Sequence, residues 1–69
     1  MKRKELPFLL GIGNKHYVIH PDPESKRALC ILVARYTGLT PGCAKTMLNR
    51  GELIVFADLI VCRQIEYNQ

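Results

Sequence analysis

The chain has 69 residues, of which 48% are hydrophobic, and a formal net charge of +4 at pH 7. This length leaves too few residues for a second hydrophobic core and predicts one compact domain over residues 1–69. The mild basic excess permits a polyanionic partner, either nucleic acid or an acidic protein, and does not choose between them.

The N-terminal stretch has the positive start and apolar continuation of a secretory signal, but it carries Glu5 and Pro7 and lacks a small-residue cleavage site. We therefore interpret it as folded structure. The longest apolar runs elsewhere fall short of a bilayer span. The three cysteines lack paired spacing, which indicates reduced thiols, so we expect a soluble cytoplasmic protein.

Two strands are predicted first. The stretches Leu6 to Ile12 and Lys15 to His20 flank Gly13-Asn14, a dipeptide that tolerates the positive φ angles of a two-residue hairpin turn. Pro7 has no amide hydrogen to donate, so we expect the first strand at an outer edge of the sheet.

Two helices follow, each with a cap and a proline at its start. Asp22-Pro23 begins the first, which we expect to run to about Thr37 and to end at Gly38. The second begins at Thr40-Pro41 and ends at Gly51. The two helices thus meet at a glycine corner.

The C-terminal region is rich in β-branched and aromatic residues. Glu52 to Phe56 and Leu59 to Tyr67 are predicted as strands, although Ala57-Asp58 is a poor turn sequence and a short helix capped by Asp58 is the alternative for the tail. The expected fold class is α+β, with two helices packed on a small antiparallel sheet in the order β-β-α-α-β, and with a further strand at the end.

The first helix has apolar residues on two sides. At 100° per residue, the face expected to meet the core carries Leu29, Leu32, Val33 and Tyr36. Cys30, Ile31 and Ala34 fall on the opposite side, where an ordinary surface helix carries charge. Either the N-terminal hairpin covers them or they form an apolar patch for a partner.

Residues for metal binding or catalysis are sparse. His16 and His20 are the only ligand pair with close spacing, and that spacing is usual on helices rather than strands. Ser25, the sole serine, lies in the first turn of a helix, and no cysteine has a histidine or carboxylate at a spacing that indicates a catalytic pair. We expect no metal, no cofactor and no enzymatic activity. A third hypothesis for the class of protein is a small structural domain that a bound zinc ion stabilises.

The glycine corner over residues 33–50 also has the spacing of a DNA-binding helix-turn-helix, with the following strands as a wing. In that alternative the protein is a transcriptional regulator, and its exposed contact residues are Thr40, Lys45, Thr46, Asn49 and Arg50. Pro41, Gly42 and Cys43 offer little hydrogen bonding to bases there.

Over residues 16–48, the chain resembles the C-terminal domain of the bacterial ribosomal stalk protein. The matching residues are Lys26, Ala28, Val33, Thr37, Gly38, Leu39, Ala44 and Lys45. The resemblance is partial, because Ile31 and Ala34 replace a basic pair of the family and no third helix follows Gly51. It implies two helices on an antiparallel sheet and a helical surface that captures protein partners, which in that family are translation-factor GTPases.

The sequence therefore predicts a non-enzymatic protein-binding module that docks through its first helix. A phage or mobile-element protein that inhibits or modulates a host machine is the hypothesis for its role. A core this small supplies only about 3 to 5 kcal/mol, which leaves a homodimer open. The predicted partner-binding residues are Lys26, Arg27, Ile31, Ala34, Arg35 and Lys45.

Overall fold

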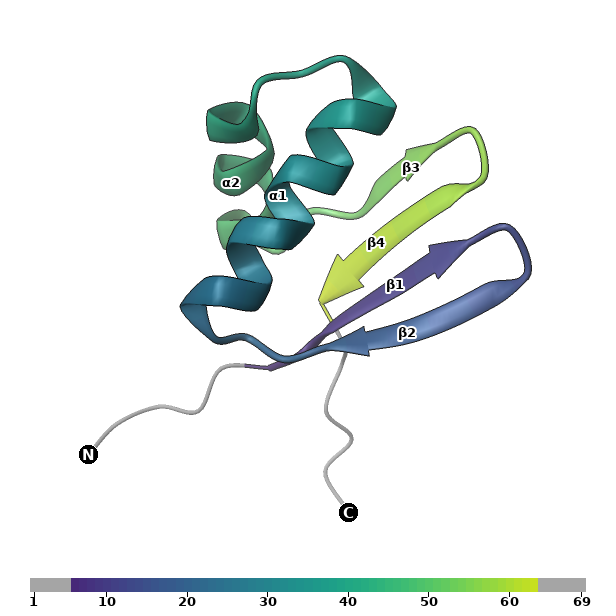
Figure 1. Cartoon of the computed structure of the whole chain (residues 1–69), viewed down its shortest axis with the longest axis horizontal. Coiled ribbons are helices and arrows are strands. Elements are labelled where there is room, and N and C mark those ends of the chain that lie inside the picture. Colours follow the sequence, from purple (N-terminus) through teal and green to yellow (C-terminus); the bar gives the residue numbers. More distant parts are fainter. Residues whose placement is uncertain (1–5, 64–69) are drawn as a thin grey trace.

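The computed structural model of the chain describes residues 6–63. Two helices and a four-stranded antiparallel sheet follow in the order β-β-α-α-β-β, which confirms the predicted α+β class (Figure 1). The elements are β1 (Phe8–Ile12), β2 (Lys15–Ile19), α1 (Pro23–Thr37), α2 (Pro41–Arg50), β3 (Ile54–Phe56) and β4 (Leu59–Arg63).

Local hydrogen bonds fix both ends of each helix, as the sequence predicts. The Asp22 carboxylate accepts the Ser25 amide hydrogen at 2.8 Å, and the Thr40 hydroxyl accepts that of Cys43 at 3.2 Å. Gly38 ends α1 with a φ of 80°, and Gly51 ends α2 with a φ of 74°. These left-handed conformations favour glycine, because a Cβ atom would crowd the following carbonyl.

The strand order β2-β1-β4-β3 places β1 inside the sheet, between β2 and β4. The expectation that Pro7 marks an outer edge is therefore wrong. Pro7 precedes the first residue of β1, so its missing amide hydrogen removes no bond from either ladder.

Both hairpins turn through two residues, and their loops lie side by side at one end of the sheet (Figure 1). Ala57-Asp58 does form the second turn despite its unfavourable sequence, with Ala57 at a φ of 56°. The Gly13 amide donates to the Asp58 carbonyl at 2.9 Å, and this bond between hairpins helps to hold the turn. β4 is a strand over 59–63, so a helix capped by Asp58 is excluded there; Gln64 to Tyr67 lie outside the described residues.

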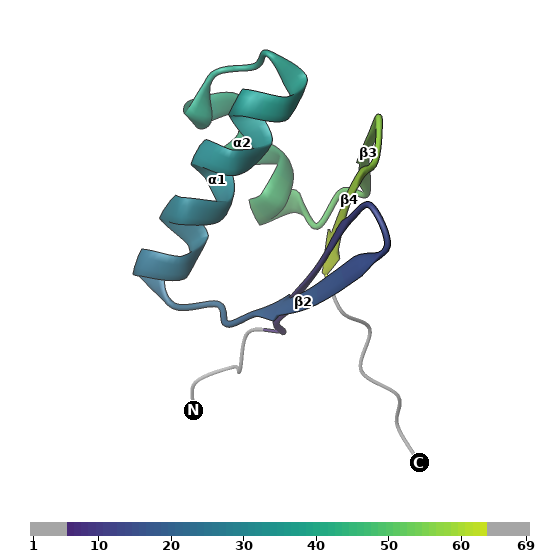
Figure 2. The same cartoon turned by 45° about the vertical axis from the view of Figure 1, so that its right-hand side comes forward.

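Both helices pack on the same face of the sheet, as Figure 2 shows with the sheet turned toward its edge. Alternate residues of the two central strands point into this layer and form the core with the inner sides of the helices. Leu29 and Val33 are buried, while Leu32 and Tyr36 are half-buried against the core, which confirms the predicted core face of α1. The core residues are Phe8, Leu10, Leu29, Cys30, Val33, Ala44, Leu48, Ile54, Leu59 and Val61.

Neither described helix is both long and apolar enough to cross a membrane within residues 6–63.

Candidate functional site: the groove between the helices

A groove of about 800 Å³ runs between α1 and α2. We call it the interhelical groove. Its lining consists of Pro21, Pro23, Lys26, Arg27, Cys30, Ile31, Pro41, Gly42, Lys45, Leu48 and Asn49.

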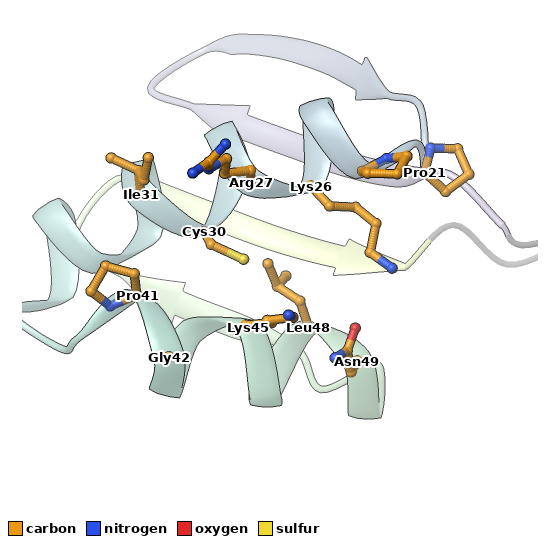
Figure 3. A pocket seen from close by; sticks show the side chains of 11 residues that line it. Pro21, Lys26, Arg27, Cys30, Ile31, Pro41, Gly42, Lys45, Leu48 and Asn49 are labelled. Carbon is orange, nitrogen blue, oxygen red and sulfur yellow. The ribbon is translucent and has the colours of Figure 1, made fainter.

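Each wall of the groove is one stripe of a helix. On α1 the lining positions are 23, 26, 27, 30 and 31, and on α2 they are 41, 42, 45, 48 and 49. Steps of three and four residues return to the same side of a helix, so each stripe faces a single direction. The helices run antiparallel, with Pro41 beside Ile31 at one end and Asn49 toward Pro21 at the other (Figure 3).

The floor of the groove is apolar. Cys30 and Leu48 are buried, and Figure 3 shows both side chains pointing into the space between the helices. Ile31 stands higher on the α1 wall and is 45% exposed. Burial raises the pKa of the Cys30 thiol, although Lys45 and Lys26 act in the opposite direction. The thiol is therefore protonated at neutral pH and contributes apolar surface rather than a nucleophile.

The rim of the groove is positive. Lys26 and Arg27 lie on the α1 wall, and Lys45 lies on the α2 wall (Figure 3). None of the described residues that line the groove is acidic. At the Pro41 end the N-terminus of α2, which has no acidic residue in its first turn, adds partial positive charge, whereas the N-terminus of α1 at the other end carries the Asp22 carboxylate. An anionic ligand with an apolar side fits this pattern.

Four of the six predicted partner-binding residues line the groove: Lys26, Arg27, Ile31 and Lys45. Ala34 continues the α1 stripe one turn further but is only 9% exposed. Its small side chain is therefore covered within the fold and offers little surface to a partner. Arg35 is exposed and lies outside the groove lining.

The sequence allows two explanations for the second apolar side of α1: cover by the N-terminal hairpin, or an apolar patch for a partner. Neither accounts for all of Cys30, Ile31 and Ala34. Cys30 and Ala34 are both buried. Cys30 belongs to the core, to which α2 contributes Ala44 and Leu48 and the N-terminal hairpin contributes Phe8 and Leu10. Ile31 alone stays largely accessible.

The five residues of the DNA-binding alternative are all exposed on or beside α2, but only Lys45 and Asn49 line the groove. The other three side chains bond within the chain. Thr40 caps α2, Thr46 donates to the Gly42 carbonyl at 3.1 Å, and Arg50 pairs with Glu52 at 3.4 Å.

Sequence reasoning did not select five of the residues that line the groove. These are Pro21, Pro23, Pro41, Gly42 and Leu48. The spacing of positions 41, 45, 48 and 49 along the second helix was the available signal, because it matches the α1 stripe in period. It gained meaning only once the two helices were known to lie antiparallel.

No cluster of three or more residues that could hold a metal ion occurs within residues 6–63. His16 lies on β2 and His20 follows that strand; both are exposed, and neither lines the groove.

Comparison with protein-family models gives no match, and comparisons with curated proteins and with solved structures give none either.

Proposed function

We propose that the chain is a non-enzymatic protein-binding module whose interhelical groove takes up an acidic, amphipathic helix of a partner protein. One observation carries this proposal: two helical stripes enclose a groove with an apolar floor and a rim that bears Lys26, Arg27 and Lys45. The floor would accept an apolar anchor, and the rim would pair with carboxylates on either side of it.

The shape of the groove favours a helix over an extended peptide. An extended peptide gains much of its affinity from backbone hydrogen bonds to a sheet edge, and the backbone groups of two helix walls are already bonded within the helices. A third helix can instead lay its ridge of side chains between the two stripes. The α1 stripe from Pro23 to Ile31 is about 12 Å long at 1.5 Å per residue, which matches roughly two turns of a bound helix.

The apolar floor also favours a protein over DNA. Duplex DNA offers phosphates and polar base edges, which would leave Cys30, Ile31 and Leu48 without a suitable contact. A helix-turn-helix regulator that uses residues 33–50 is the alternative, and it depends on α2 alone rather than on the groove.

Lys26 and Lys45, which match the stalk-protein resemblance, lie on opposite walls of the groove and support capture of a protein. We extend the proposal to a regulatory role, in which a phage or mobile-element protein occupies or redirects a host machine through this groove.

Ile31→Asp tests the groove directly. The change places a carboxylate among apolar and acidic groups of the bound helix, so we expect affinity for the purified partner to fall at least about tenfold with folding preserved. The partner would be identified by affinity purification from the native host and mass spectrometry, and binding then measured by calorimetry with purified proteins. Leu39→Asp is the matched control, since Leu39 is 41% exposed and lies outside the groove.

Undiminished binding by Ile31→Asp, or equal loss in the Leu39→Asp control, would contradict the groove as the docking site. Lys45→Glu should also weaken binding, and the loss should shrink as salt rises because the rim charges are exposed. Binding of duplex DNA distinguishes the helix-turn-helix alternative from the protein-binding groove. A gel shift at low salt that Lys45→Glu abolishes and Ile31→Asp leaves intact would favour the helix-turn-helix regulator.

A further inference from the structure

Among the described residues that line the interhelical groove, Gly42 alone has no side chain. Helical periodicity puts position 42 on the same side of α2 as Lys45 and Asn49, which also line the groove. Figure 3 shows Gly42 next to Pro41, at the end of the groove where Ile31 stands on the opposite wall. The α2 wall is therefore low at this end, and the helix backbone itself is open to a ligand.

The fold gives no reason for a glycine at position 42. Its φ is not positive, unlike that of Gly38. A Cβ atom added to Gly42 would meet the Thr40 hydroxyl oxygen at 3.9 Å, which is an ordinary van der Waals contact, so alanine fits there without a clash. Glycine also lowers the stability of a helix relative to alanine, because its flexible backbone loses more entropy on folding. A glycine that costs stability and relieves neither crowding nor backbone strain points to a role in binding.

We infer that the bound helix crosses α2 at Gly42, where the missing side chain lets a large apolar side chain of the partner lie against the α2 backbone. This inference rests on the proposed function. Packed helices lie about 8 to 10 Å apart, and the distance depends on the side chains at the contact. Glycine permits the closest approach between a backbone and a ligand. Ile31 on the opposite wall is 45% exposed and supplies the other apolar surface. Gly42 thus determines how large an apolar anchor the groove accepts.

The rim charges extend this inference to a pattern in the partner. Lys45 follows Gly42 by about one helical turn, and Arg27 precedes Ile31 by about one turn on the opposite wall. Both cations therefore lie on the same side of the anchor, toward the middle of the groove. A helix fits this arrangement when it carries an anchor the size of leucine or phenylalanine and an Asp or Glu about one turn away on the same face.

A synthetic amphipathic peptide of about 15 residues tests the inference, since shorter helices are marginal in water. The peptide carries leucines on one face, glutamates at the flanking positions and a fluorescent group at one end, and its binding is measured by fluorescence anisotropy. We expect Gly42→Leu to raise the dissociation constant at least about tenfold and Gly42→Ala to raise it about threefold, because each added side chain takes up the space of the anchor. Cys43→Leu is the matched control. It adds a side chain in the same turn, at an exposed position outside the groove lining, and should bind like the unmodified chain.

A second set of peptides separates a lost fit from a general loss of binding. In each of these peptides one leucine is shortened to alanine, and one of them should bind Gly42→Leu more tightly than the parent peptide does. Circular dichroism would confirm that every variant is folded. Two results would overturn the inference alone: binding that Ile31→Asp weakens and Gly42→Leu leaves unchanged, or a loss in Gly42→Leu that no shortened peptide reverses. A parent peptide that does not bind the unmodified chain at about 1 mM would overturn the groove proposal as well.

Discussion

Gly38 and Gly42 lie near the same helix corner but have opposite backbone requirements. Gly38 has a φ of 80°, and no heavy atom lies within 4 Å of an added Cβ there, so the cost of Gly38→Ala is backbone strain alone. We expect the free energy of unfolding to fall by about 1 kcal/mol. Gly42 lies in the first turn of α2 without a positive φ, and Gly42→Ala should raise the free energy of unfolding by about 0.5 kcal/mol.

Urea unfolding of both variants measures this contrast. Equal effects from the two substitutions would show that the left-handed backbone at Gly38 carries no special cost. Leu39 beyond the corner is exposed, but its amide donates to the Thr37 hydroxyl at 3.3 Å. This bond and the bond from the Gly38 amide to the Ala34 carbonyl hold the corner together with the glycine conformation.

Asp22 gives the fold a defined response to acid. Its bond from the Ser25 amide, with smaller help from the Ser25 hydroxyl and His20, holds the pKa of Asp22 below its ordinary value of 3.8. A lowered pKa in the folded chain stabilises folding above the unfolded pKa, and this contribution disappears as the pH falls through the folded pKa. Asp22→Asn keeps a neutral cap and removes the titration.

Thermal unfolding between about pH 6 and pH 2 checks this expectation. The difference in stability between the unmodified chain and Asp22→Asn should be largest near pH 6. It should shrink as the pH falls below about 4, because the Asp22 carboxylate then becomes protonated in the folded chain. A difference that stays constant over this range would mean that the Asp22 charge does not contribute to the cap.

At the scale of elements, Arg63 connects the sheet to the end of α2. Its guanidinium donates to the Leu48 carbonyl at 3.2 Å and lies 5.2 Å from the centre of the Phe8 ring. A cation at a helix C-terminus also meets the negative end of the dipole. We expect Arg63→Met to lower the free energy of unfolding by about 1 to 2 kcal/mol, as measured in urea.

Arg50→Met is the control for Arg63, because Arg50 is exposed and pairs only with the neighbouring Glu52 among the described interactions. Its effect should stay within about 0.5 kcal/mol. If Arg63→Met is no more harmful than Arg50→Met, the bond to α2 does not hold the layers together.

At the scale of the whole molecule, charged and apolar surfaces are separated. The groove between the helices combines cations with an apolar floor, whereas the sheet face opposite the helices carries no Lys, Arg, Asp or Glu at the seven positions Leu9, Gly11, His16, Val18, Val55, Ile60 and Cys62. The groove therefore suits a partner that has both apolar and acidic groups.

Much of the fold was predictable because its signals are local. The caps at Asp22 and Thr40 and the stops at Gly38 and Gly51 act within four residues along the chain, and all four lie as the sequence indicates. Part of the candidate site was also predictable, since helical periodicity groups Arg27 and Ile31 on one side of α1 and the family resemblance singles out Lys26 and Lys45. The rest of the α2 wall needed the relative placement of two helices, which no local pattern encodes.

The sequence by itself determined where the helices begin and end and in which order the strands follow, because capping, turn and periodicity preferences depend on near neighbours. The strands are shorter than predicted, since β1 begins at Phe8 rather than Leu6 and β3 at Ile54 rather than Glu52. Only the tertiary structure decided which surfaces are covered. It placed β4 beside β1, which made β1 an interior strand, buried Ala34 and left the sheet face opposite the helices uncovered by any described element (Figure 2). These outcomes follow from contacts between residues far apart in the chain, where burial of the whole core outweighs any single local preference.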